Sequence, residues 1–571
     1  MNNQTVADLL YKIADLLDIR GDNFFKTRAY RIAAQKIEVL DEDIEAAVNE
    51  KRLQDIPGIG DALAKKIQEF VSTGTLDYFE RLKKEIPEGI LQLLEIPTLG
   101  PKKVAALYKE LGITTIEQLR DACTEGKLRD LDGFGEITER NILRGIQLKE
   151  KTSGRVLLNV AYEEGRNYLE YLKQCKDIKQ VSIAGSLRRW KETIGDLDIL
   201  ASSDEPDAVM SYFASYDGVQ RVILQGSTKT SVLLHNDLQV DLRVVSTKSF
   251  GAALQYFTGS KEHNVKMRSL AIKQGFKLNE YGLFDKETEA FLVGQHEEEV
   301  YKKLGLSYID PELRENRGEI KAATTKKLPT LVDYNDIAGD FHVHSTWSDG
   351  ADTIEVIVQQ AQKRDYEFIG IADHSQSLKI AQGLSEERVE KKRKEIEKLN
   401  NKYDDIHIFC GTECDIKSDG TLDYSNKVLQ SFDFVYAAVH MGLKMDGKEM
   451  TKRLVTAMQN DYVTFLAHPT GRLIGRREAY ALDMNKLLEA AKETNTFLEI
   501  NAFPDRLDLN DVHAKMAKDR GITCVLGTDA HSIKNLSFMH FGIATARRGW
   551  LEKKDILNTY SLKDIKHILE R

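Results

Sequence analysis

The sequence of 571 residues predicts a multidomain α/β protein with a helical N-terminal domain, a central domain of mixed strands and helices, and a C-terminal barrel. Up to about residue 150 the apolar spacing is helical and is interrupted by short Pro/Gly turns. From Val156 to about Arg317, helical segments alternate with β-rich runs such as VSIAG and QVDLRVVS. After Ile337, short apolar runs alternate with helical segments at regular intervals, which is typical of a parallel β/α sheet.

The composition excludes several protein classes. Charged residues make up 30% and hydrophobic residues 42%, which rules out disordered, collagen-like and coiled-coil chains. No apolar run approaches the roughly 18–20 residues that a membrane span needs. The N-terminus, MNNQTVADLLYKIADLL, has an amphipathic helix pattern and does not resemble a signal peptide. The five cysteines form no regular framework, so we expect a cytoplasmic protein without membrane attachment.

Charge and histidine are distributed differently along the chain. The formal net charge is −9, whereas a nucleic-acid-binding protein more often has a basic face. Taken alone, this balance argues against a polyanionic partner. Ten of the 13 histidines, however, lie between His342 and His567. This enrichment predicts metal chemistry in the last third of the chain.

Three N-terminal segments share a plan of helix, tight glycine turn and second helix: IPGIGDALAKKI (Ile56–Ile67), IPTLGPKKVAAL (Ile96–Leu107) and LDGFGEITERNI (Leu131–Ile142). The first backbone N–H groups of a helix lack intrahelical partners and favour a phosphate, so such a hairpin can bind DNA without a basic surface. An ordinary helical turn is the alternative for one copy alone. The three copies resemble helix-hairpin-helix DNA-binding motifs, although the middle one has Thr98 in place of its first glycine. The glycines that this resemblance places against DNA are Gly58, Gly60, Gly100, Gly133 and Gly135.

A second motif, VSIAGSLRRWKETIGDLDILAS, combines a Gly-Ser pair with two aspartates. Asp196 and Asp198 are two apart in a predicted strand, so both carboxylates point to one face. A third carboxylate, Asp241, lies within the apolar run QVDLRVV, a costly place for an unpaired charge. Such a trio suits two Mg²⁺ or Mn²⁺ ions, one at a 3′-hydroxyl and one at a triphosphate. A D-x-D pair in a chance turn is the alternative.

This motif resembles the core of family X DNA polymerases such as DNA polymerase beta, as do FFKTRAYRIAA (Phe24–Ala34) and YFTGSKEHNVKMR (Tyr256–Arg268). The resemblance implies a nucleotidyltransferase palm with a fingers-like subdomain, with Asp196, Asp198 and Asp241 as catalytic metal ligands. It implies further that Arg268 contacts the template strand and that Arg243 orients Asp241. The nucleotide-binding residues that it implies are Gly185, Ser186, Arg189, Tyr256, Phe257, Gly259, Ser260 and Asn264.

The same resemblance raises the question of a lyase activity. In some family members a lysine of the helix after the first hairpin forms a Schiff base with a deoxyribose phosphate, and Lys66 matches it. A neighbouring cation such as Lys65 lowers the pKa of a lysine, as this chemistry requires. A second family lysine is Ala62 here, and a family aspartate beside the incoming base is Lys261. A helix lysine that only contacts phosphate is the alternative for Lys66.

The last third repeats one device, an apolar strand that ends in a metal-ligand residue, as in GDFHVHSTWSDG, FIGIADH and FVYAAVH. The carboxyl ends of parallel barrel strands meet at one mouth, and mixed histidine and carboxylate ligands suit Zn²⁺ or Mn²⁺. The arrangement resembles the PHP (polymerase and histidinol phosphatase) family, which implies a distorted (β/α)7 barrel with a three-metal cluster. The ligands that this resemblance implies are His342, His344, Asp349, His374, Glu413, His440, His468, Asp529 and His531.

Other polar residues of the last third match no ligand position. Asp373 and Glu499 lie near strand ends, and we expect them to support the ligands. Arg472 and Arg476 follow His468 and either hold a DNA phosphate or lie in a solvated loop. We expect surface positions for the remaining histidines of this part, His407, His513, His540 and His567.

The order of the parts resembles a bacterial family X DNA polymerase with an attached PHP exonuclease. The domains expected are 1–90 (lyase-like, helical), 91–150 (helical, DNA-binding), 151–245 (palm), 246–317 (fingers-like), 318–336 (linker) and 337–571 (PHP barrel). The resemblance implies a monomeric repair enzyme that fills short gaps in primer–template DNA from dNTPs. It also implies metal-dependent 3′–5′ exonuclease action and a further abasic-site endonuclease activity, in the cytoplasm on nucleoid DNA.

Two other functions remain open from the sequence. One is a PHP phosphoesterase acting on a small phosphate ester, with a vestigial polymerase half. The other is a non-catalytic scaffold that binds DNA ends. Both would be expected to lose part of a catalytic ligand set, so the completeness of the two sets decides between them and the polymerase–exonuclease.

Overall fold

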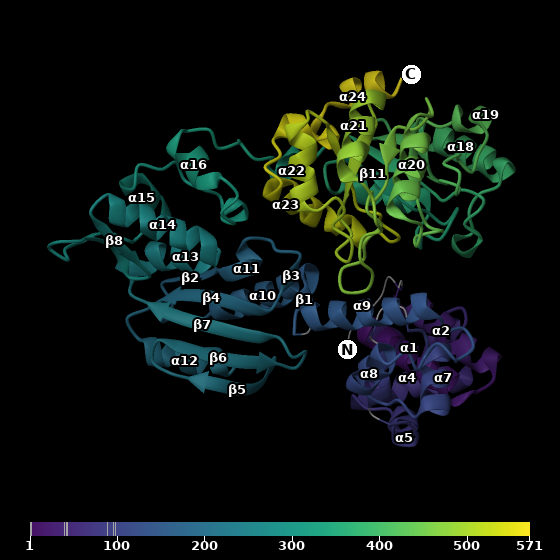
Figure 1. Cartoon of the computed structure of the whole chain (residues 1–571), viewed down its shortest axis with the longest axis horizontal. Coiled ribbons are helices and arrows are strands. Elements are labelled where there is room, and N and C mark those ends of the chain that lie inside the picture. Colours follow the sequence, from purple (N-terminus) through teal and green to yellow (C-terminus); the bar gives the residue numbers. More distant parts are fainter. Residues whose placement is uncertain are drawn as a thin grey trace. The chain divides into compact units, whose positions relative to one another are not determined.

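The structure, a computed structural model, describes residues 3–38, 40, 44–87, 89–94, 96, 99–152 and 154–570 (Figure 1). The chain divides into two compact units. The first comprises residues 1–153 with 475–478, and the second comprises 154–474 with 479–571.

The first unit is helical. Its helices α1 and α2 pack on each other through apolar positions such as Val6, Leu10 and Ile13, which are fully buried. Thr115 begins α8 with a capping box that also uses Gln118. The helices are α1 (Asn3–Arg20), α2 (Phe24–Glu38), α3 (Ile44–Asn49), α4 (Asp61–Thr73), α5 (Asp77–Glu85), α6 (Gly89–Leu94), α7 (Pro101–Leu111), α8 (Ile116–Thr124) and α9 (Glu136–Thr152).

The second unit begins with a five-stranded sheet in the order β2-β4-β7-β6-β5, in which only β4 and β7 run parallel. Alternate residues of β4 face opposite ways: Ile199 belongs to the core with α10 and α12, and Leu200 to the core with α13. The sheet is therefore covered on both faces. Its elements are α10 (Leu158–Leu172), β2 (Gln180–Ile183), α11 (Gly185–Arg188), β4 (Asp196–Ser202), α12 (Pro206–Ala214), β5 (Val219–Gln225), β6 (Lys229–Leu234) and β7 (Gln239–Val245), with a small ladder of β1 (Val156–Leu157) and β3 (Thr193–Ile194).

The segment after the five-stranded sheet, which is called the palm sheet below, forms a small α/β subdomain with its own core. This core includes Met267, Leu283 and Tyr301. Its elements are α13 (Phe250–Thr258), α14 (Lys261–Lys273), β8 (Phe276–Asn279), β9 (Gly282–Asp285), β10 (Phe291–Val293) and α15 (Glu297–Lys303). The stretch 318–336, expected as a linker, contains helix α16 (Glu319–Thr324). Ala323 packs into the subdomain core and Val332 into the barrel core. Burial of these apolar residues holds an otherwise polar segment in place.

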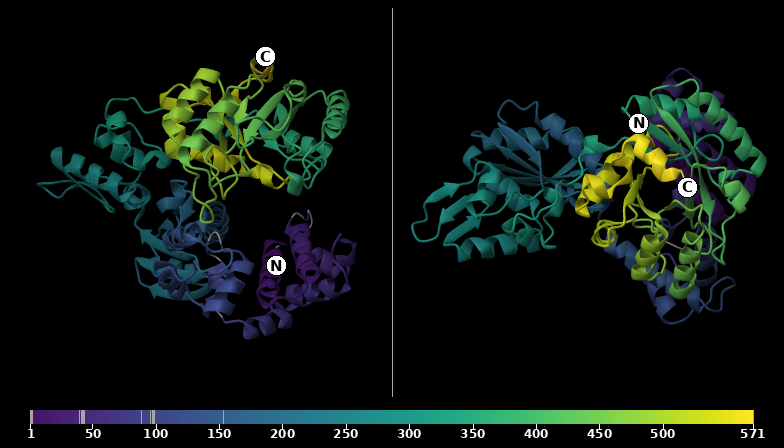
Figure 2. Two further views of the ribbon diagram at one scale, coloured as in Figure 1. Left: turned by 45° about the vertical axis from the view of Figure 1, so that its right-hand side comes forward. Right: turned by 90° about the horizontal axis from the view of Figure 1, so that it is seen from above.

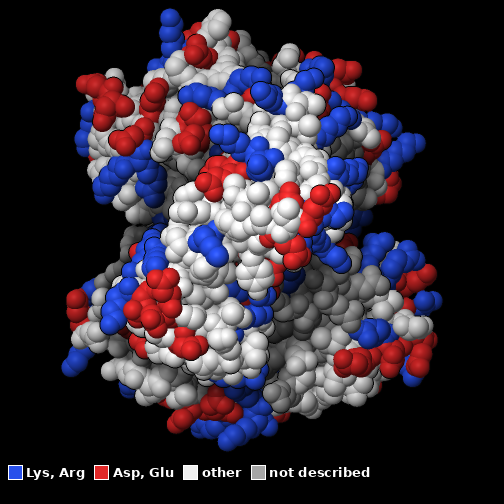
Figure 3. All heavy atoms as spheres, turned by 90° about the vertical axis from the view of Figure 1, so that its left-hand side faces the viewer, with Lys and Arg blue, Asp and Glu red and all other residues white. Residues whose placement is uncertain are grey.

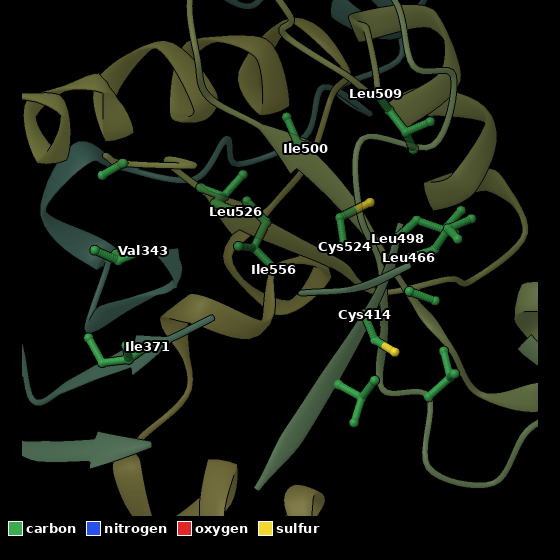
Figure 4. Packing of buried hydrophobic residues seen from close by; sticks show 14 of the residues in the cluster. Val343, Ile371, Cys414, Leu466, Leu498, Ile500, Leu509, Cys524, Leu526 and Ile556 are labelled. Carbon is green, nitrogen blue, oxygen red and sulfur yellow. The ribbon is translucent and has the colours of Figure 1, made fainter. Parts of the chain in front are cut away.

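The C-terminal part is a seven-stranded parallel barrel with the strand order β11 to β17. A parallel bridge between Val343 and Ala530 brings the last strand beside the first, so the barrel is nearly closed. Alternating outward residues such as Ile371 and Leu466 pack beneath the surrounding helices (Figure 4). The strands are β11 (Gly339–Val343), β12 (Phe368–Ile371), β13 (His407–Asp415), β14 (Phe434–Ala438), β15 (Phe465–Leu466), β16 (Phe497–Asn501) and β17 (Cys524–Gly527).

Most of the barrel helices begin at a polar capping residue, which fixes where each helix starts after the preceding loop. The side chains of Thr353, Ser385, Asp446, Asp483, Asn510 and Ser561 accept backbone N–H groups of the first turns. The helices are α17 (Ile354–Gln362), α18 (Glu386–Asn400), α19 (Asn426–Leu429), α20 (Gly447–Met458), α21 (Met484–Thr494), α22 (Asp511–Asp519), α23 (Met539–Arg548) and α24 (Leu562–Leu569), and they can be followed in Figures 1 and 2.

Aromatic rings fill one end of the barrel interior. The ring of Phe341 lies 4.7 Å from Phe368 and 5.3 Å from Phe465 between centroids. On β13 the alternation places Phe409, at the start of the strand, on the same face as Glu413 near its end. The aromatic plug, defined as Phe341, Phe368, Phe409, Phe434 and Phe465, therefore fills the amino end of the strands and leaves their carboxyl end for polar residues.

The palm and the barrel share a core within the second unit. Leu507 and Phe541 of the barrel belong to the same buried cluster as the palm residues. His540 packs between them, with its ring centroid 5.0 Å from that of Tyr162 and 6.0 Å from that of Trp190. The prediction of a surface position for His540 is therefore wrong. His407 and His513 are also half-buried, and only His567 of the four is exposed.

Two simpler expectations concern cysteines and membrane helices. All five cysteines are buried and free of disulfides. Among the described helices, none combines the length and the apolar character that crossing a bilayer requires.

Candidate active sites

The three aspartates of the five-stranded sheet lie close together: alternation along β4 places Asp196 and Asp198 on one face, and the neighbouring strand β7 adds Asp241. In the parallel ladder of β4 and β7, Asp198 is paired with Asp241. Ligand oxygens of Asp196, Asp198 and Asp241 all lie within 4.8 Å of one another. They lie on the sheet face that α13 covers, opposite the α10 face, because Leu197 and Ile199 point to the latter. An all-oxygen trio of this kind suits Mg²⁺ or Mn²⁺.

The charges of the trio are unequally compensated. Burial, together with the neighbouring charges of Asp196 and Asp241, raises the pKa of Asp198 to about 7. Burial also favours neutral Asp241, but hydrogen bonds from Lys229 and Gln239 outweigh it and hold the pKa of Asp241 below its ordinary value. A divalent ion would remove the repulsion that Asp198 experiences.

The partners of Asp241 differ from the expected one. Lys229 Nζ lies 2.5 Å from Asp241 Oδ2, and Gln239 Nε2 donates to Oδ1 over 2.9 Å. Arg243, predicted to orient Asp241, instead lies over the ring of Phe257 at 4.5 Å. Since Lys229 comes from the neighbouring strand β6, no sequence spacing pointed to it.

The loop after β2 is fitted closely against the aspartates. Gly185 has a φ of 62°, and a Cβ added there would lie 2.1 Å from Asp198 Oδ2. Ser186 is half-buried in the short helix α11. Arg189 is held by protein groups: its Nε lies 3.0 Å from Glu315 Oε1, and its Nη1 donates to the carbonyl of Thr258 over 2.8 Å.

The residues predicted to select the nucleotide lie at the junction of α13 and α14. Tyr256 and Phe257 pack edge to face, 5.1 Å apart, and Arg268 lies over the ring of Tyr256 at 5.8 Å. Asn264 Nδ2 donates to the carbonyl oxygen of Tyr256 over 2.6 Å, and its Oδ1 accepts from Gln255. The Asn264 amide is thus already bonded inside the protein.

The other two residues of this group lie in the turn between the helices. Ser260 caps α14 by accepting the N–H of His263. A Cβ at Gly259 would lie 2.6 Å from Asn264 Oδ1, so the turn requires glycine. The predicted nucleotide-binding residues of this segment therefore form one strip from α13 into α14, in which Ser260 and Asn264 are buried and Tyr256, Phe257 and Gly259 are half-buried.

The hairpin glycines divide into two kinds. Gly58 and Gly133 have φ angles of 92° and 78°, which make the turns. Gly60, Gly100 and Gly135 precede α4, α7 and α9, and no heavy atom of the described residues lies within 4 Å of a Cβ added at any of them. Open space in front of a helix N-terminus lets a phosphate approach the backbone. Thr98 lies outside the described residues.

Acidic and basic side chains are interspersed over the face of the molecule in Figure 3.

Lys66, the predicted lyase residue, is half-buried on α4 and its Nζ lies 5.0 Å from the ring of Tyr78. Lys26 lies over the same ring at 5.5 Å. A second cation thus comes from α2, in addition to Lys65, which is exposed beside Asp61.

The nine predicted barrel ligands all lie at the carboxyl end of the strands. Eight of them form three overlapping groups, in each of which one ligand atom per residue lies within 4.8 Å of the others. His344 belongs to two groups and His374 to two. His468 joins them through its Nε2, 2.8 Å from Glu413 Oε1. The groups are His344, Asp349, His374 and His531; His342, His344 and Asp529; and His374, Glu413 and His440.

Unsatisfied ligand atoms show that this donor set fits metal ions. Six buried atoms of the cluster have no hydrogen-bond partner among the described residues: His342 Nε2, His344 Nδ1 and Nε2, Asp349 Oδ1, His374 Nδ1 and Glu413 Oε2. Leaving such atoms unpaired in a protein interior is costly. Divalent ions, which histidine and carboxylate groups bind, would give these atoms a partner.

Two of the histidines, His374 and His440, favour the protonated ring in the absence of ions, whereas burial lowers the pKa of His344 and of His468 to about 4. Burial favours the neutral ring of His374, but Glu413 and Asp349 outweigh it and raise the pKa of His374 to about 10. Glu413 and Asp415 likewise raise the pKa of His440 to about 9 against burial. Metal loading has to displace these protons, since only the deprotonated rings bind ions.

A second layer holds the ligands, as expected for Asp373 and Glu499. Glu499 Oε1 lies 2.6 Å from His342 Nδ1, and Oε2 accepts the backbone N–H of His468. Asp373 accepts from Ser345 and pairs at 2.9 Å with Lys392, whose side chain is fully buried. Lys392 comes from α18, a helix whose charged sequence gave no sign of this role.

Arg506, in the loop after β16, also lies at the ligand cluster, although no motif in the sequence indicates it. Arg506 Nε lies 3.4 Å from Asp529 Oδ2, and the side chain is 19% exposed. Its guanidinium therefore borders the ligand cluster with donors that no described residue uses. Arg472 is placed differently from either reading of the sequence: it donates to the carbonyls of Arg506 and Leu507 and pairs with Glu192 of the palm at 2.8 Å.

Family models match four parts of the chain. A helix-hairpin-helix domain matches residues 1–76, and a SAM-like helix-hairpin-helix tandem matches 90–148. The DNA polymerase beta thumb matches 253–315, and the PHP domain matches 340–503. The matches follow the order of the helical unit, the subdomain after the palm, and the barrel.

Curated relatives cover the whole chain or one half of it. The DNA polymerase/3'-5' exonuclease PolX of Bacillus subtilis (strain 168) is 41% identical over 573 residues, which cover 100% of both chains. A probable phosphatase of Thermoanaerobacter sp. (strain X514) is 27% identical over 231 residues, 38% of this chain and 89% of the relative. DNA polymerase lambda of Rattus norvegicus is 25% identical over 350 residues, 55% of this chain and 56% of the relative.

Proposed function

The chain belongs to the PolX family of DNA polymerase/3'-5' exonucleases, and on this premise we propose which residues perform each activity. The chain is a DNA-directed DNA polymerase and 3′–5′ exonuclease that acts on DNA and dNTPs and uses divalent metal ions. The polymerase activity belongs to the palm aspartates, and the exonuclease activity to the histidine-rich barrel. The convergence of two separate ligand sets within one chain is the observation that carries this assignment.

In the palm, Asp196, Asp198 and Asp241 would hold two Mg²⁺ or Mn²⁺ ions, which supply activation of the primer 3′-hydroxyl and charge neutralisation at the triphosphate. Lys229 balances Asp241 until then. Gly185 allows Asp198 to lie close against the predicted triphosphate loop, and Arg189 has to leave Glu315 to reach a triphosphate there.

The remaining nucleotide contacts follow from the α13–α14 strip. Tyr256 and Phe257 flank the sugar, where their packed rings exclude a 2′-hydroxyl. Gly259, Ser260 and Asn264 line the approach to the base, and Arg268 reaches the template strand from its place over Tyr256. Gap filling on primer–template DNA is the reaction that this strip supports.

In the barrel, the nine ligands would hold three Mn²⁺ or Zn²⁺ ions, which supply an activated water and charge stabilisation at the scissile phosphate. Arg506 is placed to bind a non-bridging oxygen of that phosphate, because its unused donors border the cluster beside Asp529. Glu499 and Asp373 keep His342 and the β11 loop in position. Abasic-site cleavage is a second reaction open to the same groups.

Binding to DNA would rest on the three hairpins. No heavy atom of the described residues lies within 4 Å of a Cβ added at Gly60, Gly100 or Gly135, so the first turns of α4, α7 and α9 are open to phosphates of the duplex. We propose that the chain acts as a monomer in the cytoplasm, on nucleoid DNA, in the repair of short gaps. Neither alternative fits as well: a scaffold or a vestigial polymerase half would be expected to lose ligands, and both sets are intact.

A Schiff-base lyase at Lys66 is a separate proposal. It is supported by the position of Lys66 beside Tyr78, with Lys26 over the same ring. Borohydride trapping of the full chain on a 5′-deoxyribose-phosphate substrate tests it. Lys66→Ala should abolish the trapped adduct, whereas Lys65→Ala, at the exposed neighbour, should keep it. An adduct that persists in Lys66→Ala would overturn the assignment.

Two variants separate the main activities. Asp196→Ala should abolish primer extension and keep 3′ degradation, and His344→Ala should do the reverse, because the two residues belong to different ligand groups. Each protein serves as the folding control for the other, since its remaining activity reports an intact chain. If Asp196→Ala extends primers, or if His344→Ala degrades 3′ ends at the wild-type rate, the corresponding site is wrongly assigned.

A further inference from the structure

A cavity of about 220 Å³ lies between the palm and the barrel of the second unit, outside both ligand clusters. Trp190 and Lys191, which follow the predicted triphosphate loop, line one side. Asp511 of α22 and Arg548 of α23 line the other, and Arg317 completes the wall. The cavity thus touches segments adjacent to both catalytic regions.

The arginines of the cavity wall are already paired. Arg548 Nη2 lies 2.6 Å from Asp511 Oδ2, and Arg317 Nη1 lies 2.9 Å from the same oxygen. Arg548 Nη1 also lies 3.2 Å from Glu315 Oε1. Glu192, the other acid of the wall, pairs with Arg472. Every carboxylate near the cavity therefore has an arginine partner.

Lys191 is the remaining cation of the cavity wall. It is half-buried, and among the described residues its ammonium group has no hydrogen-bond or ion-pair partner. Burial, and next the charge of Arg548, lower its pKa. An uncompensated, partly desolvated cation at a cavity wall is a place where an anion binds favourably.

The size of the cavity limits the ligand. Pockets for drug-sized molecules span roughly 300–1,000 Å³, and a water occupies about 30 Å³. A cavity of about 220 Å³ therefore accommodates a group the size of one or two phosphates with its water. Arg317 and Arg548 have donors with fork geometry, which suit phosphate and carboxylate groups alike.

We propose that this cavity is an anion site for orthophosphate or pyrophosphate, separate from the polymerase and exonuclease centres, with Lys191 as its main contact. Pyrophosphate is the product of each nucleotide addition, so the polymerase reaction itself supplies a ligand of this class. The site is also connected to the palm, because Arg548 donates to the carbonyl oxygen of Arg189 over 2.5 Å and shares Glu315 with the Arg189 side chain. An anion that draws on Arg548 therefore acts on the loop expected to hold the incoming triphosphate.

Calorimetric titration of the full chain with orthophosphate and, separately, with pyrophosphate tests the proposal. The proteins are wild type, Lys191→Met, Lys191→Arg and the control Lys176→Met, an exposed lysine of the same palm. Losing one charge-assisted hydrogen bond should weaken the Lys191-dependent site by about tenfold or more in Lys191→Met. Lys191→Arg should retain binding, and Lys176→Met should match wild type. Metal-bound phosphate in the two catalytic centres contributes equally to all four proteins.

The outcomes separate clearly. The anion with the greater Lys191-dependent affinity identifies the source, pyrophosphate indicating the polymerase product. Equal affinities of wild type and Lys191→Met for both anions would overturn the proposal. It would also be overturned if only a single-stranded oligonucleotide showed Lys191-dependent binding. Thermal melting of Lys191→Met excludes misfolding as the cause of a loss, and if this variant melts early, Lys191→Gln replaces it in the same titration.

Discussion

Asp198 and Asp241 are direct partners in the parallel ladder of β4 and β7, so two carboxylates face each other across adjacent strands on one face of the sheet. Among the described residues, only Lys229 offsets this arrangement with a direct ion pair, and it does so at Asp241. Asp198 therefore bears most of the repulsion, which is consistent with its raised pKa of about 7. Two predictions follow from this unequal distribution.

Replacing Asp198 by Asn should weaken metal binding and activity but raise the stability of the metal-free protein. The variant loses a ligand, so primer extension should fall by at least about 100-fold. Without metal, the same change removes a repulsive charge and should raise the melting temperature of the EDTA-treated protein. Primer-extension rates and thermal melting with and without Mn²⁺ check both effects. A variant that melts below wild type in EDTA would contradict this account of the charges.

Replacing Lys229 by Met should tighten the binding of Mn²⁺ to the palm by about three- to tenfold, because the lysine no longer competes for Asp241. Calorimetric titration in the His344→Ala background, which weakens the barrel site, measures this change. Lys179→Met is the matched control, since Lys179 pairs with Asp204 at the exposed end of the same sheet. Weaker Mn²⁺ binding in Lys229→Met than in the control would show that the lysine supports the site rather than competing in it.

Arg506 should matter to the exonuclease alone. Arg506→Gln should lower 3′ degradation by about 100-fold through the loss of a charged donor at the scissile phosphate, while Arg506→Lys should restore part of it. Primer extension and bound-metal content should remain at wild-type levels, which distinguishes phosphate binding from loss of the cluster. A fall in metal content equal to the fall in rate would instead make Arg506 a support for Asp529.

Metal removal should destabilise the barrel more than the palm, because six buried ligand atoms of the barrel have no hydrogen-bond partner among the described residues. Adding Mn²⁺ at about 100 times its dissociation constant should stabilise the folded barrel by about 2.7 kcal/mol. His344→Ala should lose most of the resulting shift in melting temperature, since His344 belongs to two of the three ligand groups. Asp196→Ala should keep it, and equal shifts in the two variants would show that the stabilising ions bind elsewhere.

Acidification should weaken the junction of palm and barrel through His540. Burial, with the charge of Arg166 opposing a second cation, lowers the pKa of His540, so the folded chain favours the neutral ring. The stability that this ring contributes is present above about pH 6.5 and is lost as the pH falls below that value. Between pH 7 and pH 5 the melting temperature of wild type should therefore fall about 1–2 °C further than that of His540→Phe. Parallel curves for the two proteins would assign no such role to His540.

The sequence predicted the fold class because its signals are local. Three glycine hairpins, a D-x-D strand and the repeated pairing of an apolar strand with a ligand residue predict a helical domain, a mixed sheet and a parallel barrel, and this fold class is confirmed. The alternation of strand residues also predicts that Asp196 and Asp198 share a face. Their partnership with Asp241 needed the parallel ladder, which no single strand reveals.

What the sequence could not supply are contacts between distant elements. Lys229, Lys392 and Arg506 reach the sites from a neighbouring strand, a surface helix and a loop, at positions that carry no motif. The same limit explains the wrong expectation for His540, whose aromatic neighbours Tyr162 and Trp190 belong to the palm. Pattern analysis identifies the ligands, whereas tertiary packing determines which side chains hold or oppose them.

The aromatic plug at the amino end of the barrel limits how ions and ligands enter and leave the barrel. With five phenylalanine rings filling that end, ions, water, the DNA end and the released nucleotide have only the carboxyl-end mouth in common. A DNA strand seated there stands between the ions and bulk solvent. Chelators should therefore strip the barrel more slowly while DNA is bound, and ions already in place should outlast several rounds of cleavage on one strand.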